Sequence, residues 1–225
     1  MPPLRHPDIR AVLFDLDGTL IDSAVELAQA LNQMRAQRGL PALPVQRYRP
    51  HVGSGARGLL PIGLDTCPAH TAFEALRDEF FDTYAGCLGA GTQPFEGVAP
   101  MLQQLQARGI RWGIVTNKIE RFARPIVTQT PALAHCAALV AGDTTTHTKP
   151  HPEPLLEAAR RLDIAPAHCI YVGDDPRDMQ AGRSAGMGTI AALYGYIAPG
   201  EDPAQWAADH SIQAPMELLQ KLGID

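Results

Sequence analysis

The sequence predicts an α/β fold in which helices cover both faces of a parallel sheet and the chain after the first strand carries an all-helical insert. Five short apolar runs have the length and the strand-forming residues of buried parallel strands. The later runs alternate with amphipathic stretches of helical length, the pattern typical of parallel α/β sheets. The alternation is broken once, between residues 22 and 91, where no run predicts a strand.

The composition sets the class of protein. The chain has 225 residues, 45% of them hydrophobic and 19% charged, which suits one large domain or one domain with a smaller insert. The formal charge of -5 is spread along the chain, whereas nucleic-acid binding needs a basic surface. No segment approaches the roughly 18 apolar residues of a membrane span, and the first apolar run is too short for a secretion signal. We therefore expect a cytoplasmic protein, a monomer or homodimer, that binds neither nucleic acid nor membranes.

The predicted elements follow in order along the chain. The five strands cover residues 11–14, 112–115, 137–141, 169–172 and 189–193. Two helices of the sheet region are indicated by apolar residues at helical spacing, one around Leu102 and the other around Ala159. Together these elements predict a core made of residues 1–21 and 92–225.

The insert, residues 22–91, carries two clear helical patterns. Asp22 and Ser23 are good N-caps for a helix that runs to Gly39, and a second helix is marked by Phe73 and the apolar residues up to Tyr84. The Gly- and Pro-containing stretch 89–94 is the predicted return to the core.

Polar residues follow the predicted strands. The first strand ends in Asp15-Leu16-Asp17 and the second in Thr116-Asn117. A polar loop after the third leads to Lys149-Pro150, and the fourth ends in Gly173-Asp174-Asp175 with Asp178 close behind. Ligands of parallel α/β sheets bind at the carboxyl ends of the strands, so these groups are expected to meet in one crevice.

This set of side chains suits phosphoryl transfer. Asp15 is ionised at neutral pH and can act as a nucleophile. Attack on a phosphate, which is itself an anion, needs a cation; Mg²⁺ with Asp15 and Asp174 as ligands meets this need. Lys149 adds a fixed positive charge against the phosphate.

The remaining groups complete the predicted chemistry. Thr116 and Asn117 can donate hydrogen bonds to phosphate oxygens. Asp17 can reach the leaving-group side as a general acid, and Gly18 frees the backbone for the turn that this requires. Taken singly, each motif has a plainer interpretation: a capped turn, an N-cap or a solvated lysine. Asp175 in particular is equally compatible with a role beside the metal and with helix capping.

Two further patterns have weaker support. Residues 53–58 match GxGxxG, but no strand precedes them; they are interpreted as a bend between helices or as a loop whose NH groups and Arg57 face the substrate. His147 and His151 flank Lys149 without another nitrogen or sulfur ligand, so we do not expect a metal there. The cysteines have no CxxC pair and are expected to be buried free thiols: Cys67, Cys87, Cys136 and Cys169.

The motifs together resemble those of the haloacid dehalogenase superfamily: residues 15–20 (Asp-Leu-Asp-Gly-Thr-Leu), Thr116-Asn117, Lys149-Pro150 and residues 173–178. The resemblance implies a Rossmann-like core with a helical cap of type 1. It implies that Asp15 accepts the phosphoryl group, that Asp17 is the acid/base, and that Mg²⁺ binds Asp15, the backbone carbonyl of Asp17, and Asp174. Asp175 and Asp178 would act through water or by orienting Lys149. The predicted substrate-binding residues are Gly18, Thr19, Arg57 and Asn117.

Within the superfamily, residues 149–156 and 171–182 are most similar to the phosphoglycolate phosphatases and also resemble the N-acetylmuramic acid 6-phosphate phosphatases. The resemblance implies hydrolysis of a small phosphorylated metabolite. A sugar phosphomutase on the same scaffold and a non-catalytic phosphate-binding module are the alternatives. Substrate choice is expected to lie in the cap.

Overall fold

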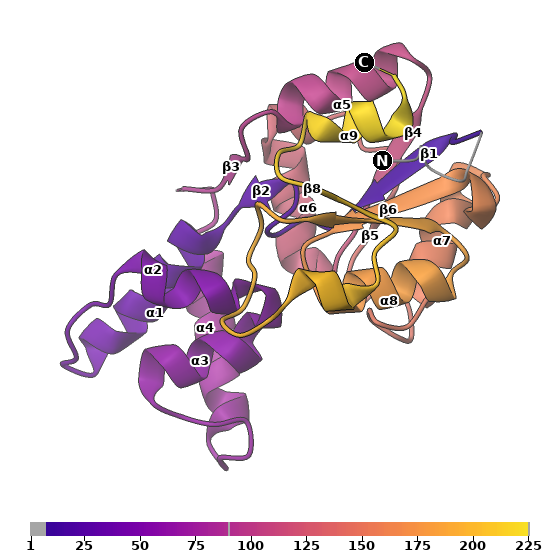
Figure 1. Ribbon diagram of the computed structural model, residues 1–225. Coiled ribbons are helices and arrows are strands. Elements are labelled where there is room, and N and C mark those ends of the chain that lie inside the picture. The colour runs from indigo at the N-terminus through magenta and orange to yellow at the C-terminus, as the bar shows by residue number, and fades with distance from the viewer. Residues whose placement is uncertain (1–7, 90, 225) are drawn as a thin grey trace.

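The structure, a computed structural model, describes residues 8–89 and 91–224 (Figure 1). Its centre is a six-stranded parallel sheet with the strand order β5-β4-β1-β6-β7-β8. The strands are β1 (Ala11–Phe14), β4 (Arg111–Val115), β5 (Leu139–Val140), β6 (Cys169–Gly173), β7 (Gly188–Ala192) and β8 (His210–Ile212). The first predicted strand therefore lies in the interior of the sheet, between the second and the fourth.

Helices cover both faces of the sheet, as predicted. Val12 and Phe14 of β1 pack on one face against α5 (Val98–Ala107), α6 (Glu120–Gln129) and α9 (Glu217–Leu222). Ala11 and Leu13 alternate to the other face and pack against α7 (Glu153–Leu162) and α8 (Pro176–Ser184). A continuous apolar run is needed because both faces of β1 are buried.

The predicted strands differ from the observed ones at the edges of the sheet. The third strand is limited to two residues, β5, although Ala137 still donates a backbone hydrogen bond to Trp112. The sixth strand, β8, was not predicted, because its three residues pair only with β7 and one of them is exposed. A strand at the edge of a sheet needs no long apolar run, so its sequence signal is weak.

Between residues 22 and 93 the described part of the chain forms only helices, and one short strand borders this stretch at each end. These helices are α1 (Ala24–Gln37), α2 (Val45–Tyr48), the 3₁₀-helix η1 (Arg49–Ser54), α3 (Gly55–Leu64) and α4 (Phe73–Ala85). They surround an apolar cluster of their own and lie to one side of the sheet (Figure 1). The division into residues 22–91 and the remainder stays a prediction; of its residues, 1–7, 90 and 225 lie outside the described ranges.

The two crossings between these parts are joined by a small antiparallel pair, β2 (Ile21–Asp22) and β3 (Gln93–Pro94). Ser23 is the N-cap residue of α1, but the prediction that its side chain caps the helix is wrong. The Ser23 hydroxyl instead donates to the Asp17 carboxylate. A local capping pattern was thus overridden by a contact with the preceding loop.

The cysteines are all free, but the expectation of burial holds only in part: Cys87 and Cys169 are buried, Cys136 is half-buried and Cys67 is exposed. Among the residues that the structure describes, no helix has both the length and the apolar character needed to cross a bilayer.

Candidate active site

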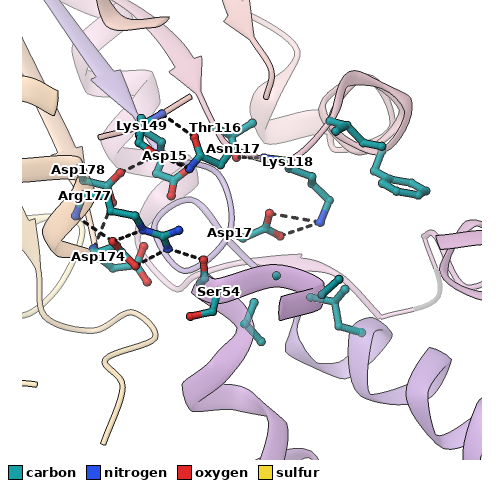
Figure 2. Close-up of a pocket in the computed structure, with 18 of the residues that line it drawn as sticks. Asp15, Asp17, Ser54, Thr116, Asn117, Lys118, Lys149, Asp174, Arg177 and Asp178 are labelled. Atoms are coloured by element: carbon teal, nitrogen blue, oxygen red, sulfur yellow. Dashed lines mark hydrogen bonds and ion pairs between the residues drawn. The ribbon is translucent and has the colours of Figure 1, made fainter. Parts of the chain in front are cut away.

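Polar side chains from four segments meet at the carboxyl ends of the central strands (Figure 2). Asp15 follows β1, Thr116 follows β4 and Asp174 follows β6, while Lys149 comes from the loop after β5. They line one cavity of about 230 Å³, which is closed on the other side by α3, α4 and η1. The predicted convergence is therefore present, because parallel strands end at the same edge of the sheet.

Lys149 is the buried cation of this cluster. Its Nζ lies 3.0 Å from Asp15 Oδ1, and its side chain is 2% exposed. It also donates to Asp178 Oδ1 at 2.8 Å and to the Tyr171 hydroxyl at 2.7 Å. Burial alone would lower the pKa of Lys149, but the Asp15 and Asp178 carboxylates outweigh it and raise that pKa. Lys149 therefore remains an ammonium group that is fixed against the Asp15 carboxylate.

Asp174 completes a group of three carboxylates. Oxygen atoms of Asp15, Asp174 and Asp178 lie within 4.8 Å of one another. Burial, and next the charges of Asp15 and Asp178, raise the pKa of Asp174 well above its ordinary value. Thr19 Oγ1 and the backbone NH of Tyr196 donate to Asp174 at 2.9 and 2.7 Å.

These carboxylates suit a hard divalent cation. Mg²⁺ prefers oxygen ligands and is bound through one or two carboxylates. Three carboxylates lie beside the single positive charge of Lys149, and a divalent cation would neutralise the remaining negative charge. Asp15, Asp174 and Asp178 could hold such an ion, and the assignment of Asp15 and Asp174 as its ligands stays a prediction. The Asp17 carboxylate lies outside this group and faces another partner (Figure 2).

Asp17 is held by Lys118. The Lys118 ammonium lies 3.1 Å from Oδ1 and 3.2 Å from Oδ2 of Asp17, and the Ser23 hydroxyl donates to the same carboxylate. Lys118 follows Thr116-Asn117 directly in the chain, a position that could have revealed it, but the sequence predictions omitted it. In the arrangement described, Asp17 is directed away from the Lys149 cluster (Figure 2).

Three of the predicted substrate-binding residues do not line the cavity: Gly18, Thr19 and Arg57. Gly18 has φ +86°, and a Cβ there would lie 2.0 Å from Asp174 Oδ2, so it is needed for close packing. The Thr19 hydroxyl donates a hydrogen bond to the Asp174 carboxylate. Arg57 is exposed on α3, because the helix begins at Gly55 and directs this side chain outward.

Asn117 lines the cavity, but its amide is already engaged. Its Nδ2 donates to the carbonyl of Lys149 at 2.9 Å, and its Oδ1 accepts from the Lys149 NH at 3.0 Å. Asn117 thus fixes the loop that carries Lys149. Because the bond to Lys149 uses one of the two Nδ2 hydrogens, the contact between the Asn117 amide and a phosphate stays a prediction.

Asp175 caps α8 and pairs with Arg177. Its side chain accepts from the NH of Arg177, and Asp178 accepts from the Asp175 NH, which together form a capping box. The helix-capping alternative for Asp175 is therefore confirmed. Arg177, which the sequence predictions missed, lies 2.6 Å from Asp175 and also donates to the carbonyl of Gly53 in η1. It links the core to the helical part.

The wall of the cavity opposite the carboxylates is mainly apolar. It is lined by Leu27, Val52, Ala56, Phe80, Phe81, Tyr84, Ile119 and Phe122. Gly53, Ser54 and Gly55 of the GxGxxG-like stretch also line it, so that stretch borders the site with its backbone rather than with Arg57.

The His147–His151 pair lies outside the cavity and gains one neighbour that was not predicted, Glu153. His147 Nδ1 lies 2.7 Å from Glu153 Oε2, and the Glu153 NH donates to His151 Nδ1. The two histidines are exposed, and their ring nitrogens on this side are hydrogen-bonded to Glu153 itself.

Comparisons with known proteins agree with this geometry. A sequence model described as a haloacid dehalogenase-like hydrolase matches residues 9–186. A phosphoglycolate phosphatase of Xanthomonas campestris pv. campestris (strain 8004) is 47% identical over 217 residues, which cover 96% of this chain and 97% of that protein. An N-acetylmuramic acid 6-phosphate phosphatase of Pseudomonas aeruginosa is 40% identical over 219 residues, 97% of each chain.

Solved structures show the same fold. The crystal structure of a predicted phosphoglycolate phosphatase from Haemophilus somnus superposes with a TM-score of 0.82 at 26% identity, covering 94% of this chain and 97% of that one. The family match spans the loops that carry Asp15, Thr116, Lys149 and Asp174. On the match to the family model and the length and identity of these alignments, the chain belongs to the haloacid dehalogenase-like hydrolases.

Proposed function

We propose that this chain is a Mg²⁺-dependent phosphatase that hydrolyses a small phosphorylated metabolite through a phospho-aspartate on Asp15. The phosphatase class rests on the family and on relatives of known name that align along almost the whole chain. The observation that carries the mechanism is the contact of 3.0 Å between Asp15 Oδ1 and the buried ammonium of Lys149, beside two further carboxylates.

In the proposed first step, an oxygen of Asp15 attacks phosphorus and the bond from phosphorus to the ester oxygen breaks. Asp17 takes up a proton from solvent when it turns from Lys118, and it gives this proton to the ester oxygen as that bond breaks. Lys149 fixes the orientation of Asp15 and offsets the negative charge of the phosphate. Bound Mg²⁺, held by Asp15 and Asp174, would supply charge neutralisation for two anions that must meet.

In the second step, water attacks phosphorus of the acyl phosphate and releases inorganic phosphate with Asp15 restored. Asp17, now a carboxylate, takes the proton of that water. Thr116 lines the cavity beside Asp15 and can donate to a phosphate oxygen. The same aspartate thus serves as acid and then as base.

Phosphoglycolate is the first candidate substrate, because the relatives of higher identity carry that name. N-acetylmuramic acid 6-phosphate is the second, and one observation favours it: the cavity wall formed by Phe80, Phe81, Phe122 and their neighbours is apolar. The acetyl and lactyl methyl groups of the amino sugar can bury apolar surface there, whereas the two-carbon glycolate cannot.

A panel of phosphorylated metabolites, assayed for inorganic phosphate with and without Mg²⁺, tests the proposal. The panel includes both candidates, a generic aryl phosphate, and sugar phosphates analysed for isomer formation. We expect one of the two candidates to be hydrolysed well above the aryl phosphate. Isomer formation without phosphate release would instead identify a phosphomutase, and no turnover of any member would refute a phosphatase.

Asp15→Asn tests the intermediate. The amide cannot act as the nucleophile, so turnover should fall by at least about 10³-fold and no acid-stable label should transfer from ³²P substrate to protein. A folded variant that retains turnover would refute the phospho-aspartate. The proposal includes a cytoplasmic location, which metabolite substrates favour and cell fractionation checks.

A further inference from the structure

Lys118 is a buried cation, and its ion-pair partner Asp17 is also the proposed general acid. Its side chain is 9% exposed, its Nζ lies 3.1 Å from Asp17 Oδ1, and it stands 4.8 Å from the centre of the Tyr84 ring. Asp17 is the residue that must turn to the ester oxygen in the proposed mechanism. When it turns, the Lys118 ammonium loses its carboxylate inside a largely apolar cavity, and an uncompensated buried charge is strongly unfavourable.

The other cations of the cavity keep their ion-pair partners during the proposed reaction. Among the described residues, Lys118, Lys149 and Arg177 are the cationic side chains that line it. Lys149 keeps Asp15 and Asp178 as partners. Arg177 keeps Asp175 at 2.6 Å, a carboxylate with no part in proton transfer. Lys118 is therefore the cation for which the substrate must supply a replacement anion.

We propose that Lys118 binds a carboxylate on the leaving group of the substrate, and that this contact releases Asp17 for proton transfer. The inference rests on the proposed phosphatase function and deepens it by naming the substrate class: phosphate monoesters of hydroxy acids. Lys118 is then a specificity-determining residue. Substrates without the carboxylate leave Asp17 paired with Lys118 and react slowly.

Two features of the surroundings support this assignment. An acid that protonates the ester oxygen must come within hydrogen-bond distance of it, so the partner of that acid lies close to the leaving group. The Tyr84 hydroxyl is buried beside the Lys118 ammonium, which can only donate to it, and the hydroxyl has no acceptor for its own proton among the described residues, although Tyr84 lines the cavity. A carboxylate held by Lys118 would give this hydroxyl an acceptor, and hydrogen-bonded polar groups are the rule in buried sites.

The test compares substrates that differ only in the carboxylate. The first pair is phosphoglycolate and 2-hydroxyethyl phosphate; the second is N-acetylmuramic acid 6-phosphate and the same sugar phosphate with its lactyl carboxylate converted to a carboxamide. The wild type should prefer the acid of whichever pair it hydrolyses. Lys118→Met should reduce kcat/KM for that acid by about 100-fold, the usual scale for truncating one member of a buried charge pair. For the partner without a carboxylate, kcat/KM should not fall and should rise by up to about 10-fold, because the ammonium group that holds Asp17 is gone.

Three variants separate specificity from structure. Lys118→Arg should restore part of the preference for the acid, because it keeps the positive charge. Tyr84→Phe should weaken the preference by about 5- to 10-fold, the scale of one lost hydrogen bond. Lys221→Met, which removes a lysine from α9 on the far side of the core, is the matched control and should leave both substrates unchanged (Figure 1).

The failures are distinguishable. Equal loss on both members of a pair in Lys118→Met would overturn the inference, since it means that Lys118 only positions Asp17. A wild type with no preference for the acid would overturn it as well. If the wild type releases phosphate from none of these substrates nor from an aryl phosphate, the proposed function itself fails.

Discussion

At the scale of single residues, the site depends on how one ammonium group is held. Lys149 is surrounded by Asp15, Asp178 and the Tyr171 hydroxyl, and that hydroxyl donates a hydrogen bond to the carbonyl of Val115 at 2.7 Å. Asp178 also closes the capping box of α8 by accepting from the Asp175 NH. One carboxylate therefore fixes both the cation beside Asp15 and the helix that follows Asp174.

Asp178→Asn should lower kcat by about 10- to 100-fold at saturating Mg²⁺, the range typical for groups that orient a metal-site residue. The amide cannot balance the charge of Lys149, whose Nζ lies 2.8 Å from Asp178 Oδ1. Steady-state kinetics with the best substrate of the panel give the measurement. Tyr171→Phe, which removes a neutral contact of the same ammonium, serves for comparison and should cost less. Wild-type kcat in a folded Asp178→Asn protein would contradict this role.

The polar residues at the carboxyl edge of the sheet could be predicted from the sequence because each directly follows a strand. Asp15, Thr116 and Asp174 need only the rule that parallel strands share one carboxyl edge. Tyr171 could not be predicted, since it lies within an apolar run and its hydroxyl acts across the sheet. The position of Lys118 directly after Thr116-Asn117 could have placed it at the site, but its contacts with Asp17 and Tyr84 form only in the folded chain.

At the scale of elements, Asp22 of β2 stabilises the junction between the sheet and the helices of residues 24–85. Arg49 of η1 lies 2.6 Å from its carboxylate, and the Tyr196 hydroxyl donates to it at 2.7 Å while accepting from the Ser23 NH. Burial alone would raise the pKa of Asp22, but the bonds from Arg49 and Tyr196 outweigh it and lower that pKa. Tyr196 lies far from Asp22 in the sequence, so no local sequence pattern predicted their hydrogen bond.

Asp22→Asn should lower Tm by about 2–4 °C at pH 7, which corresponds to about 1 kcal/mol for a partly exposed pair. Because the pKa of folded Asp22 lies below its ordinary value, its contribution is present above that value and is lost as pH falls through the lowered one. Tm of the two proteins should therefore differ from pH 8 to pH 5 and converge below about pH 4. Asp82→Asn, in an exposed pair with Arg121, is the matched control and should change little. A difference that grows with acidity would contradict the sign.

At the scale of the whole molecule, the sheet is closed by apolar clusters on its two faces, and the helical part has a third cluster that includes Phe122 and Tyr196 from the core. The alternation of strand and helix signals predicted the first two clusters. The packing of the helical part against the core could not be predicted in detail, because it depends on side chains from both parts that meet only after folding. The carboxylates of Asp15, Asp174 and Asp178 lie close together at one edge of the sheet, and their mutual repulsion lowers the stability of the folded chain.

Saturating Mg²⁺ should therefore stabilise the whole molecule. At about 100 times the dissociation constant, an ion that binds only the folded chain adds about 2.7 kcal/mol, or roughly 5–10 °C in Tm for a protein of this size. Asp174→Asn removes one of the crowded charges, and its amide can still bond Thr19 and the Tyr196 NH. Without metal this variant should match or exceed the wild type in Tm, because the repulsion is relieved, and its response to Mg²⁺ should disappear. Thermal unfolding with EDTA and with Mg²⁺ measures both effects; an undiminished Mg²⁺ response in Asp174→Asn would place the ion elsewhere.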